Sequence, residues 1–217
     1  MSKLGNISEI AEELRAVLDA TNQAREEALR VAREIVRLSA NSIRASHREE
    51  YDKACELMSE ARTKIEQIKS VLEDHLDIYY AGYVQDAQKE YAEAELTYAI
   101  IREQLLPKYS ELGVEPAAYL NGLAEAIGEC RRHVLDLLRN GELDRAERIL
   151  CTMDEAYYAL ITFDYPDAVT QGLRRQTDMV RGVLERTRGD LTLLQQQREL
   201  ENAIQRAVER LVNAQSA

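Results

Sequence analysis

The chain has 217 residues and a formal net charge of −11, with 28 basic and 39 acidic side chains. Its hydrophobic fraction of 45% is enough for a core, whereas 9 glycines and 3 prolines give few signals for turns or strands. No apolar run approaches the ~18 residues that span a membrane, and three widely separated cysteines predict neither a disulfide framework nor a zinc site. We therefore expect one helical domain, residues 1–217, in the reducing cytoplasm.

Apolar residues of the first predicted helix, from about Ser8 to Ala45, recur at spacings of three and four. This heptad pattern is typical of helices that pack at a shallow angle. Its members, which we call the α-seam, are Ile7, Ile10, Leu14, Val17, Thr21, Ala24, Ala28, Val31, Ile35 and Leu38.

Six further helices are predicted, separated by proline, glycine and aspartate signals. They cover about residues 49–72, 77–106, 116–140, 143–162, 167–188 and 191–213, and the last break is placed at Gly189-Asp190. No segment of useful length shows the period-2 alternation of a strand. The sequence therefore predicts an all-α chain of seven helices.

Three acids of the third predicted helix, Asp86, Glu90 and Glu93, share one narrow stripe because their spacings are four and three. Stacked carboxylates repel one another unless a cation lies opposite them. Hard cations such as Mg²⁺ or Mn²⁺ prefer such oxygen ligands. From periodicity alone, a solvated acidic face is the favoured interpretation of this stripe, and a cation site is the alternative.

A fourth acid, Asp154, has only apolar or aromatic neighbours at helical spacing. These are Leu150, Tyr157, Tyr158 and Ile161. A carboxylate that points toward a packed face costs free energy unless it is paired or binds a metal. Pairing with an arginine or a tyrosine hydroxyl would explain Asp154 as well as a metal would.

The net charge argues against a nucleic-acid partner unless basic residues gather locally. The first predicted helix offers such a gathering on a second stripe, in line with Asn41 and roughly 27 Å long at the usual helical rise. This arginine row, with no acid among its members, consists of Arg30, Arg33, Arg37, Arg44 and Arg48. It predicts a surface for a nucleic-acid backbone, and a solvated or salt-bridged face is the alternative.

Several short motifs resemble the translin superfamily, in order and approximate spacing, over about residues 25–188. Residues 87–94 (Ala-Gln-Lys-Glu-Tyr-Ala-Glu-Ala) are similar to the acidic motif Gln-Glu-Tyr-x-Glu-Ala of translin-associated factor X (Trax). Residues 119–122 (Tyr-Leu-Asn-Gly), with 129–132 (Glu-Cys-Arg-Arg), resemble the superfamily patterns Tyr-Leu-x-Gly and Glu-x-x-Arg, and residues 140–144 resemble the Asn-Gly-Asp-x-Asp turn. Asp154 falls where Trax has an aspartate before a small residue and an aromatic, here after an extra Glu155. The His-x-His pair of translin is absent.

The resemblance, which is to archaeal-type, Trax-like members, implies a seven-helix α bundle that assembles into a hollow, roughly octameric shell holding RNA or single-stranded DNA. It also implies a metal-dependent endoribonuclease in which Glu90, Glu93 and Asp154 are the catalytic and metal-binding acids. Mg²⁺ or Mn²⁺ would position and activate a water, and the arginine row would hold single-stranded RNA, single-stranded DNA or a short duplex. The alternative is a non-catalytic binding scaffold of the translin type. Whether Asp86 or Glu155 joins the metal site stays open.

Overall fold

The structure is a computed structural model that describes residues 6–215, and within that range it contains helices and turns but no strand. Six long helices form the frame: α1 (Ile7–His47), α2 (Tyr51–Val71), α4 (Gly82–Ile101), α6 (Pro116–Arg139), α7 (Leu143–Leu160) and α9 (Leu173–Gln215). Three single-turn helices lie in the connections: α3 (Leu76–Tyr79), α5 (Tyr109–Leu112) and α8 (Asp167–Thr170). The all-α prediction is confirmed.

The third predicted helix is shorter than expected at both ends. An extended residue, Ala81, separates α3 from α4. The helix then ends at Ile101, well before Pro107, because Glu103 adopts a left-handed conformation (φ 54°) and Gln104 N–H donates back to the Ala99 carbonyl. Such a left-handed residue is a common helix terminator.

The predicted break at Gly189-Asp190 is wrong, because α9 runs through it. Arg131 of α6 spans this point, donating to Thr187 Oγ1 and Asp190 Oδ2, both at 2.9 Å. One internal glycine costs a helix only about 1 kcal/mol relative to alanine, so this tertiary support outweighs it. The break lies instead at Gln171 and Gly172, both with positive φ.

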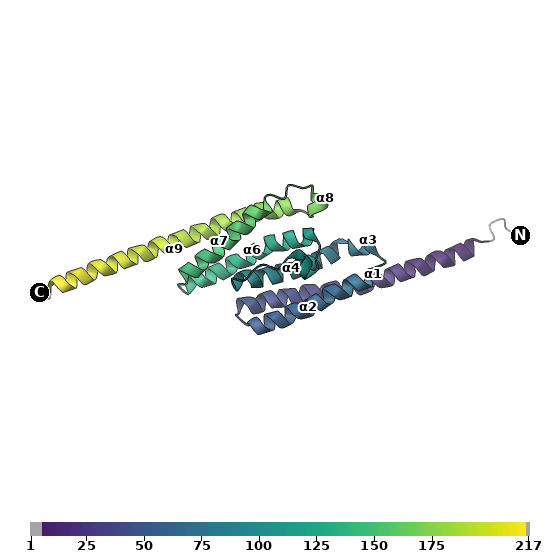
Figure 1. The fold of residues 1–217 in the computed structure, drawn as a ribbon, viewed down its shortest axis with the longest axis horizontal. Helices are drawn as coiled ribbons and strands as arrows, with labels where there is room; N and C mark the ends of the chain where they lie inside the picture. Colours follow the sequence, from purple (N-terminus) through teal and green to yellow (C-terminus); the bar gives the residue numbers. More distant parts are fainter. Residues whose placement is uncertain (1–5, 216–217) are drawn as a thin grey trace.

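The long helices follow one another across the body in the order α2, α1, α4, α6, with α7 and α9 covering the far side of α6 (Figure 1). The inner half of the α-seam, from Ala28 to Leu38, is buried in this arrangement. The core continues through Tyr91 and Leu96 of α4 and Ile127 of α6. Two long helices, α4 and α6, therefore lie side by side in the middle of the body.

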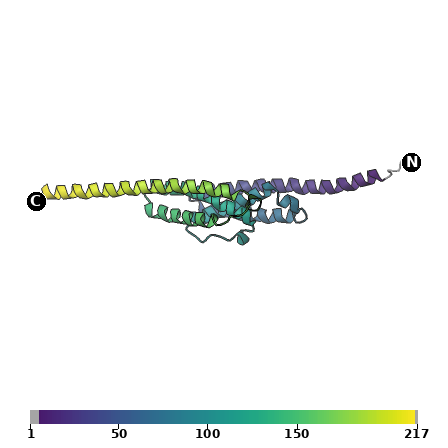
Figure 2. The same ribbon diagram turned by 90° about the horizontal axis from the view of Figure 1, so that it is seen from above.

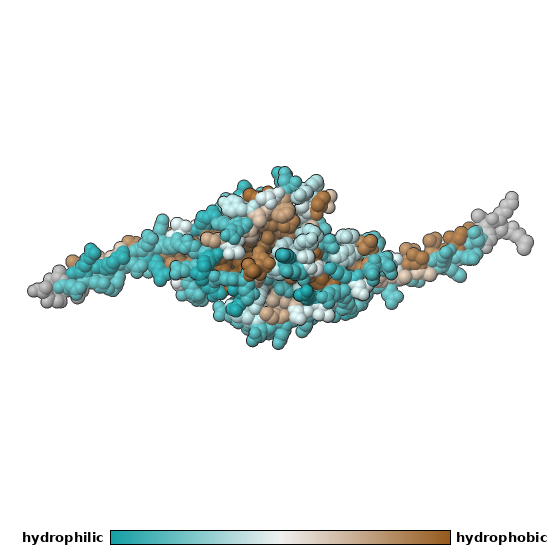
Figure 3. Space-filling view, in the orientation of Figure 1, coloured by the Kyte–Doolittle hydropathy of each residue, from teal (hydrophilic) through white to brown (hydrophobic). Residues whose placement is uncertain are grey.

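The two terminal helices leave the body as arms at its opposite ends (Figures 1 and 2). The outer half of the α-seam is exposed on the first arm, with Leu14 at 58% and Val17 at 60%. Leu200, Ile204 and Leu211 are likewise exposed on the arm of α9. In the space-filling view, brown apolar atoms follow the α1 arm (Figure 3). The α-seam thus has a partner in the protomer over only half of its length.

No helix in the described range combines the length and the apolarity needed to cross a membrane.

Candidate metal centre

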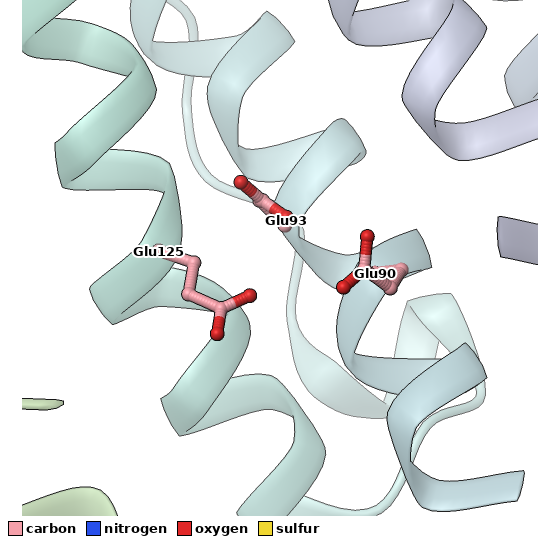
Figure 4. Close-up of side chains that lie close together, drawn as sticks. All are labelled: Glu90, Glu93 and Glu125. Carbon is pink, nitrogen blue, oxygen red and sulfur yellow. The ribbon is translucent and has the colours of Figure 1, made fainter. Parts of the chain in front are cut away.

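Three glutamates from two adjacent helices converge in the middle of the body. Glu90 and Glu93 project from α4, and Glu125 faces them from α6 (Figure 4). One carboxylate oxygen of each lies within 4.8 Å of the other two. The sequence-predicted pair Glu90 and Glu93 is thus brought together, and its third member comes from a helix that the sequence did not implicate.

Glycine at position 122 allows the two helices to approach so closely. A Cβ atom built on Gly122 of α6 would lie 2.8 Å from the Lys89 carbonyl oxygen, 2.9 Å from Ala92 Cβ and 3.0 Å from the Glu93 nitrogen, all on α4. Any larger residue would push the helices apart. Because Glu125 follows Gly122 by about one helical turn, this contact brings its carboxylate to the acids of α4.

Glu93 is the most buried of the three acids, with 9% of its surface exposed. Burial, followed by the negative charges of Glu90, Glu125 and Glu129, raises its pKa to about 8. Burial also raises the pKa of Glu90, opposed by the neighbouring Lys89. A carboxylate held in this way is short of positive charge, which is the condition that a bound cation relieves.

Hydrogen bonds from neighbouring helices fix the surroundings of these acids. Glu125 Oε1 accepts from Lys89 Nζ at 2.9 Å and from Gln176 Nε2 of α9 at 3.0 Å. Glu129, one turn further along α6, is paired with His47 Nε2 at 2.6 Å. That hydrogen bond lowers the pKa of Glu129 and keeps its carboxyl ionised beside Glu93.

The donor set fits a hard divalent cation. All three candidate ligands offer carboxylate oxygens, the type that Mg²⁺ and Mn²⁺ select. Oxygens bound to one Mg²⁺ at about 2.1 Å lie at most about 4.2 Å apart, close to the 4.8 Å limit that contains the three oxygens here. The spacing of the three oxygens is therefore compatible with one shared cation.

An apolar groove lined by arginines, which we call the arginine groove, lies between α1 and α4. Its volume is about 430 Å³, and Val36 lines it together with Tyr83, Asp86 and three members of the arginine row, Arg33, Arg37 and Arg44. Positions 83, 86, 90 and 93 recur at helical spacing along one side of α4. The groove therefore ends about one turn of α4 from the first acid of the metal centre.

The two outer arginines of the row do not join this groove. Arg30 is paired with Glu27 and with Glu34, the latter at 2.6 Å. Arg48 lines a separate pocket with His47 and His133. Three of the five members of the arginine row therefore line one groove, whereas acids at helical spacing neutralise Arg30 and Arg48 lies at the other pocket.

Known proteins share this architecture. No family model matches the chain. The uncharacterized protein MJ0175 of Methanocaldococcus jannaschii is 34% identical over 187 residues, which are 85% of this chain and 82% of that protein. The structure of AfC3PO, a translin- and Trax-type protein, matches with a TM-score of 0.81 and 35% identity over 87% of this chain and 98% of the other. The chain belongs to the translin superfamily, as a Trax-like member.

Two further solved structures support the same fold. AfC3PO in complex with duplex RNA gives a TM-score of 0.81 at 35% identity, over 87% of this chain and 97% of the other. Apo-NeC3PO, at 23% identity, shares the fold alone, with a TM-score of 0.76 over 89% of this chain and 100% of the other. The translin-type fold is thereby confirmed, with the helix count revised as described above.

Asp154 of this Trax-like chain does not reach the metal centre in the protomer. Its two carboxylate oxygens accept from Arg188 at 2.8 and 2.9 Å, across α7 and α9. The face was expected to be packed, but Tyr158 and Ile161 beside it are 62% and 48% exposed. The expected convergence of Asp154 with Glu90 and Glu93 is therefore not seen in the protomer, where the arginine pairing that was left open is observed instead.

Neither of the two acids left open joins the glutamate group. Asp86 lines the arginine groove, and Glu155 is exposed on α7. The residue that the sequence missed is Glu125. Glu125 lies between the two translin-like motifs of this helix and in neither of them, although Gly122, Glu125 and Glu129 recur at three and four along one side of α6. What that side packs against could not be deduced from the spacing.

Proposed function

We propose that this translin-type protein is a metal-dependent endoribonuclease that binds RNA inside an oligomeric shell. The observation that carries the proposal is the convergence of Glu90, Glu93 and Glu125 from two helices, with Glu93 buried and crowded by like charges. Ordinary ion pairing does not explain this cluster, because three acids meet there and Lys89 is the lysine that pairs with two of them. This donor set is the one expected to hold Mg²⁺ or Mn²⁺.

RNA is the proposed partner for two reasons. AfC3PO, which is 35% identical over most of this chain, has been solved with duplex RNA. In this chain the groove rimmed by Arg33, Arg37 and Arg44 supplies guanidinium groups, which suit phosphate recognition. The apolar residues that line the groove, such as Val36, also suit an unpaired base, so we propose that single-stranded RNA binds as well as duplex.

An oligomeric shell resolves the conflict between an acidic chain and an anionic partner, because the acidic residues can face outward while the arginine groove faces inward. The exposed halves of the terminal helices support assembly, since apolar stripes of that length are rarely left in water. We propose a hollow octamer, as the resemblance to the superfamily implies.

The chain's own residues divide the chemistry among them. A bound divalent cation would activate water and stabilise the negative charge that develops on the phosphate. Glu90, Glu93 and Glu125 would hold that cation. Glu129, ionised and oriented by His47, lies beside Glu93 and adds negative charge that favours a bound cation. The arginine groove would hold the strand so that a phosphate lies next to these acids.

Cleavage of a labelled RNA, single-stranded or duplex, with Mn²⁺ and with Mn²⁺ plus EDTA tests the proposal. Glu93→Gln and Glu125→Gln should each abolish EDTA-sensitive cleavage, while RNA binding by gel shift persists. Asp154→Asn is the matched control, since it also converts one carboxylate to an amide, and it should leave at least about half of the activity.

The outcomes separate the possible ligand sets. Loss of cleavage in Asp154→Asn together with full activity in Glu125→Gln would restore the acid set expected from the sequence. RNA binding with no cleavage by the wild-type protein, in any divalent metal, would make it a binding scaffold.

A further inference from the structure

The side chain of Lys89 bridges two of the three acids at the metal centre. Its Nζ atom lies 2.9 Å from Glu125 Oε1 and 3.5 Å from Glu90 Oε1. Only 21% of the side chain is exposed. Lys89 directly precedes Glu90 on α4, so its ammonium links that helix to α6 at the point where the carboxylates meet.

This ammonium and a divalent cation would compete for the same oxygens. Both would lie within a few ångströms of Glu125 Oε1, and at about 4 Å two positive charges repel strongly in the partly dehydrated interior of a protein. Lys89 therefore has to leave its present contacts when a metal ion binds. In the metal-free protein the same contacts offset the repulsion among the three acids.

A second hydrogen bond makes that exchange possible without disordering the acid. Gln176 Nε2 of α9 also donates to Glu125 Oε1, at 3.0 Å. Glu125 thus remains oriented toward Glu90 and Glu93 when the lysine moves. The lysine is an unbranched chain that can rotate toward solvent, since its side chain is not fully buried.

We propose that Lys89 is the internal counter-ion of this carboxylate cluster and that a divalent cation binds there only by displacing its ammonium. Lys89 then keeps the cluster assembled in the absence of metal and sets how much metal is needed to load it. The inference rests on the proposed function insofar as the cluster is a metal site. It goes further by assigning a regulatory part in metal loading to a residue that is not a ligand.

The test is direct titration of the metal-free, full-length protein with Mn²⁺. Binding is monitored by calorimetry or by the electron paramagnetic resonance signal of free Mn²⁺. Lys89→Gln keeps the length and polarity of the side chain but removes its charge. It should bind Mn²⁺ at least about tenfold more tightly than the wild type, as expected when a like charge a few ångströms away is removed. Its melting temperature without metal should be lower, and the rise on adding Mn²⁺ larger.

Lys64→Gln is the matched control. Lys64 on α2 also pairs with a glutamate, Glu34 at 2.8 Å, but away from the cluster, and its removal changes the net charge by the same amount. Its Mn²⁺ affinity should stay within about twofold of wild type. Glu93→Gln should lose the binding, which locates the titrated ion at the cluster.

Each result decides the matter. Equal Mn²⁺ affinity in Lys89→Gln and wild type, or weaker affinity in the variant, overturns the role of Lys89 and leaves the metal centre intact. Binding by Lys89→Gln in the absence of measurable binding by wild type supports the role in its strongest form. If neither protein binds Mn²⁺, the cluster is not a metal site, and the role of Lys89 fails together with the proposed function.

Discussion

Gly122 of α6 lies directly against the Lys89 carbonyl oxygen of α4, at a distance that leaves no room for a side chain. A Cβ atom would be 2.8 Å from that oxygen, which is part of the helix backbone and has little freedom to move. The same contact sets the separation of Glu125 from Glu90 and Glu93. One glycine therefore links the packing of the body to the geometry of the metal centre.

Replacing Gly122 with alanine should destabilise the protein by about 1–3 kcal/mol, the usual cost of forcing an extra methyl group into a packed interface. It should also weaken Mn²⁺ binding, because α4 and α6 must separate. Urea unfolding and Mn²⁺ titration measure the two effects.

Gly128→Ala, on the same helix, is the control, because its Cβ would meet nothing within 4 Å. We therefore expect unchanged metal binding and up to about 1 kcal/mol of added stability. Equal effects in both variants would contradict the close-packing account.

The stability of the metal-free protein should fall as the pH rises from about 4.5 to about 8. Burial and neighbouring carboxylates raise the pKa of Glu93 in the folded state to about 8, from 4.5 in the unfolded chain. In this window the folded state binds more protons than the unfolded state, so raising the pH favours unfolding. The measurement is the free energy of unfolding against pH in EDTA.

Glu93→Gln should flatten that slope and be more stable than wild type at pH 8. Glu56→Gln, at an exposed position of α2, removes the same charge elsewhere and should keep the slope. Burial also raises the pKa of Glu90 and Glu95, which act in the same sense, and lowers the pKa of His133, which acts in the opposite sense below its ordinary value. Glu93→Gln therefore removes only part of the slope. The pKa of Glu129 is lowered by the hydrogen bond from His47, and its effect lies below the ordinary carboxyl pKa and outside this window. A wild-type slope retained in Glu93→Gln would assign the pH dependence to other groups.

Replacing Arg33, Arg37 and Arg44 together with alanine should weaken RNA binding and reduce its salt dependence. For single-stranded RNA the slope of log affinity against log salt should fall by about 0.7 for each lost phosphate contact. Filter binding at several salt concentrations measures this. Arg30→Ala is the control from the same helix, and it should have little effect because Arg30 is already paired with Glu27 and Glu34. An unchanged slope in the triple variant would place the RNA-binding surface elsewhere.

The exposed half of the α-seam should be an assembly interface. Light scattering of the wild-type protein should give a mass several times the 24.7 kDa of the chain, with eight copies expected. Leu14→Glu together with Val17→Glu should reduce that mass. Both side chains are largely exposed in the protomer, so the charges that replace them should disrupt contacts between copies and not the core of one copy. Gln23→Glu, an exposed position outside the stripe, should leave it unchanged. A wild-type mass near 24.7 kDa would exclude an assembled shell.

Much of the helical pattern could be predicted from the sequence, because the hydrogen bonds of a helix join residues that are close together in the chain. A period of 3.6 residues fixes which side chains share a stripe, so the α-seam, the pair Glu90 and Glu93 and the core of the arginine row could be predicted from spacing alone. The pairing of Arg30 with acids could also be predicted, since Glu27 and Glu34 lie three and four residues away in the helix. Where the prediction was wrong at this level, as at Gly189-Asp190, a weak local signal was outweighed by Arg131 on another helix.

Relations between helices were decided only by the tertiary structure. Sequence spacing gives no distance between Glu125 and Glu90, which are brought together by a backbone contact at Gly122. Nor does it say that Asp154 meets Arg188, that His47 meets Glu129, or that Lys89 lies between two acids. Those pairings depend on how closely and at what angle two helices pack, and that depends on side-chain volumes along the whole interface. The chemical character of each residue could therefore be predicted from the sequence. Which residues lie together to form the site was decided by the packing of the helices.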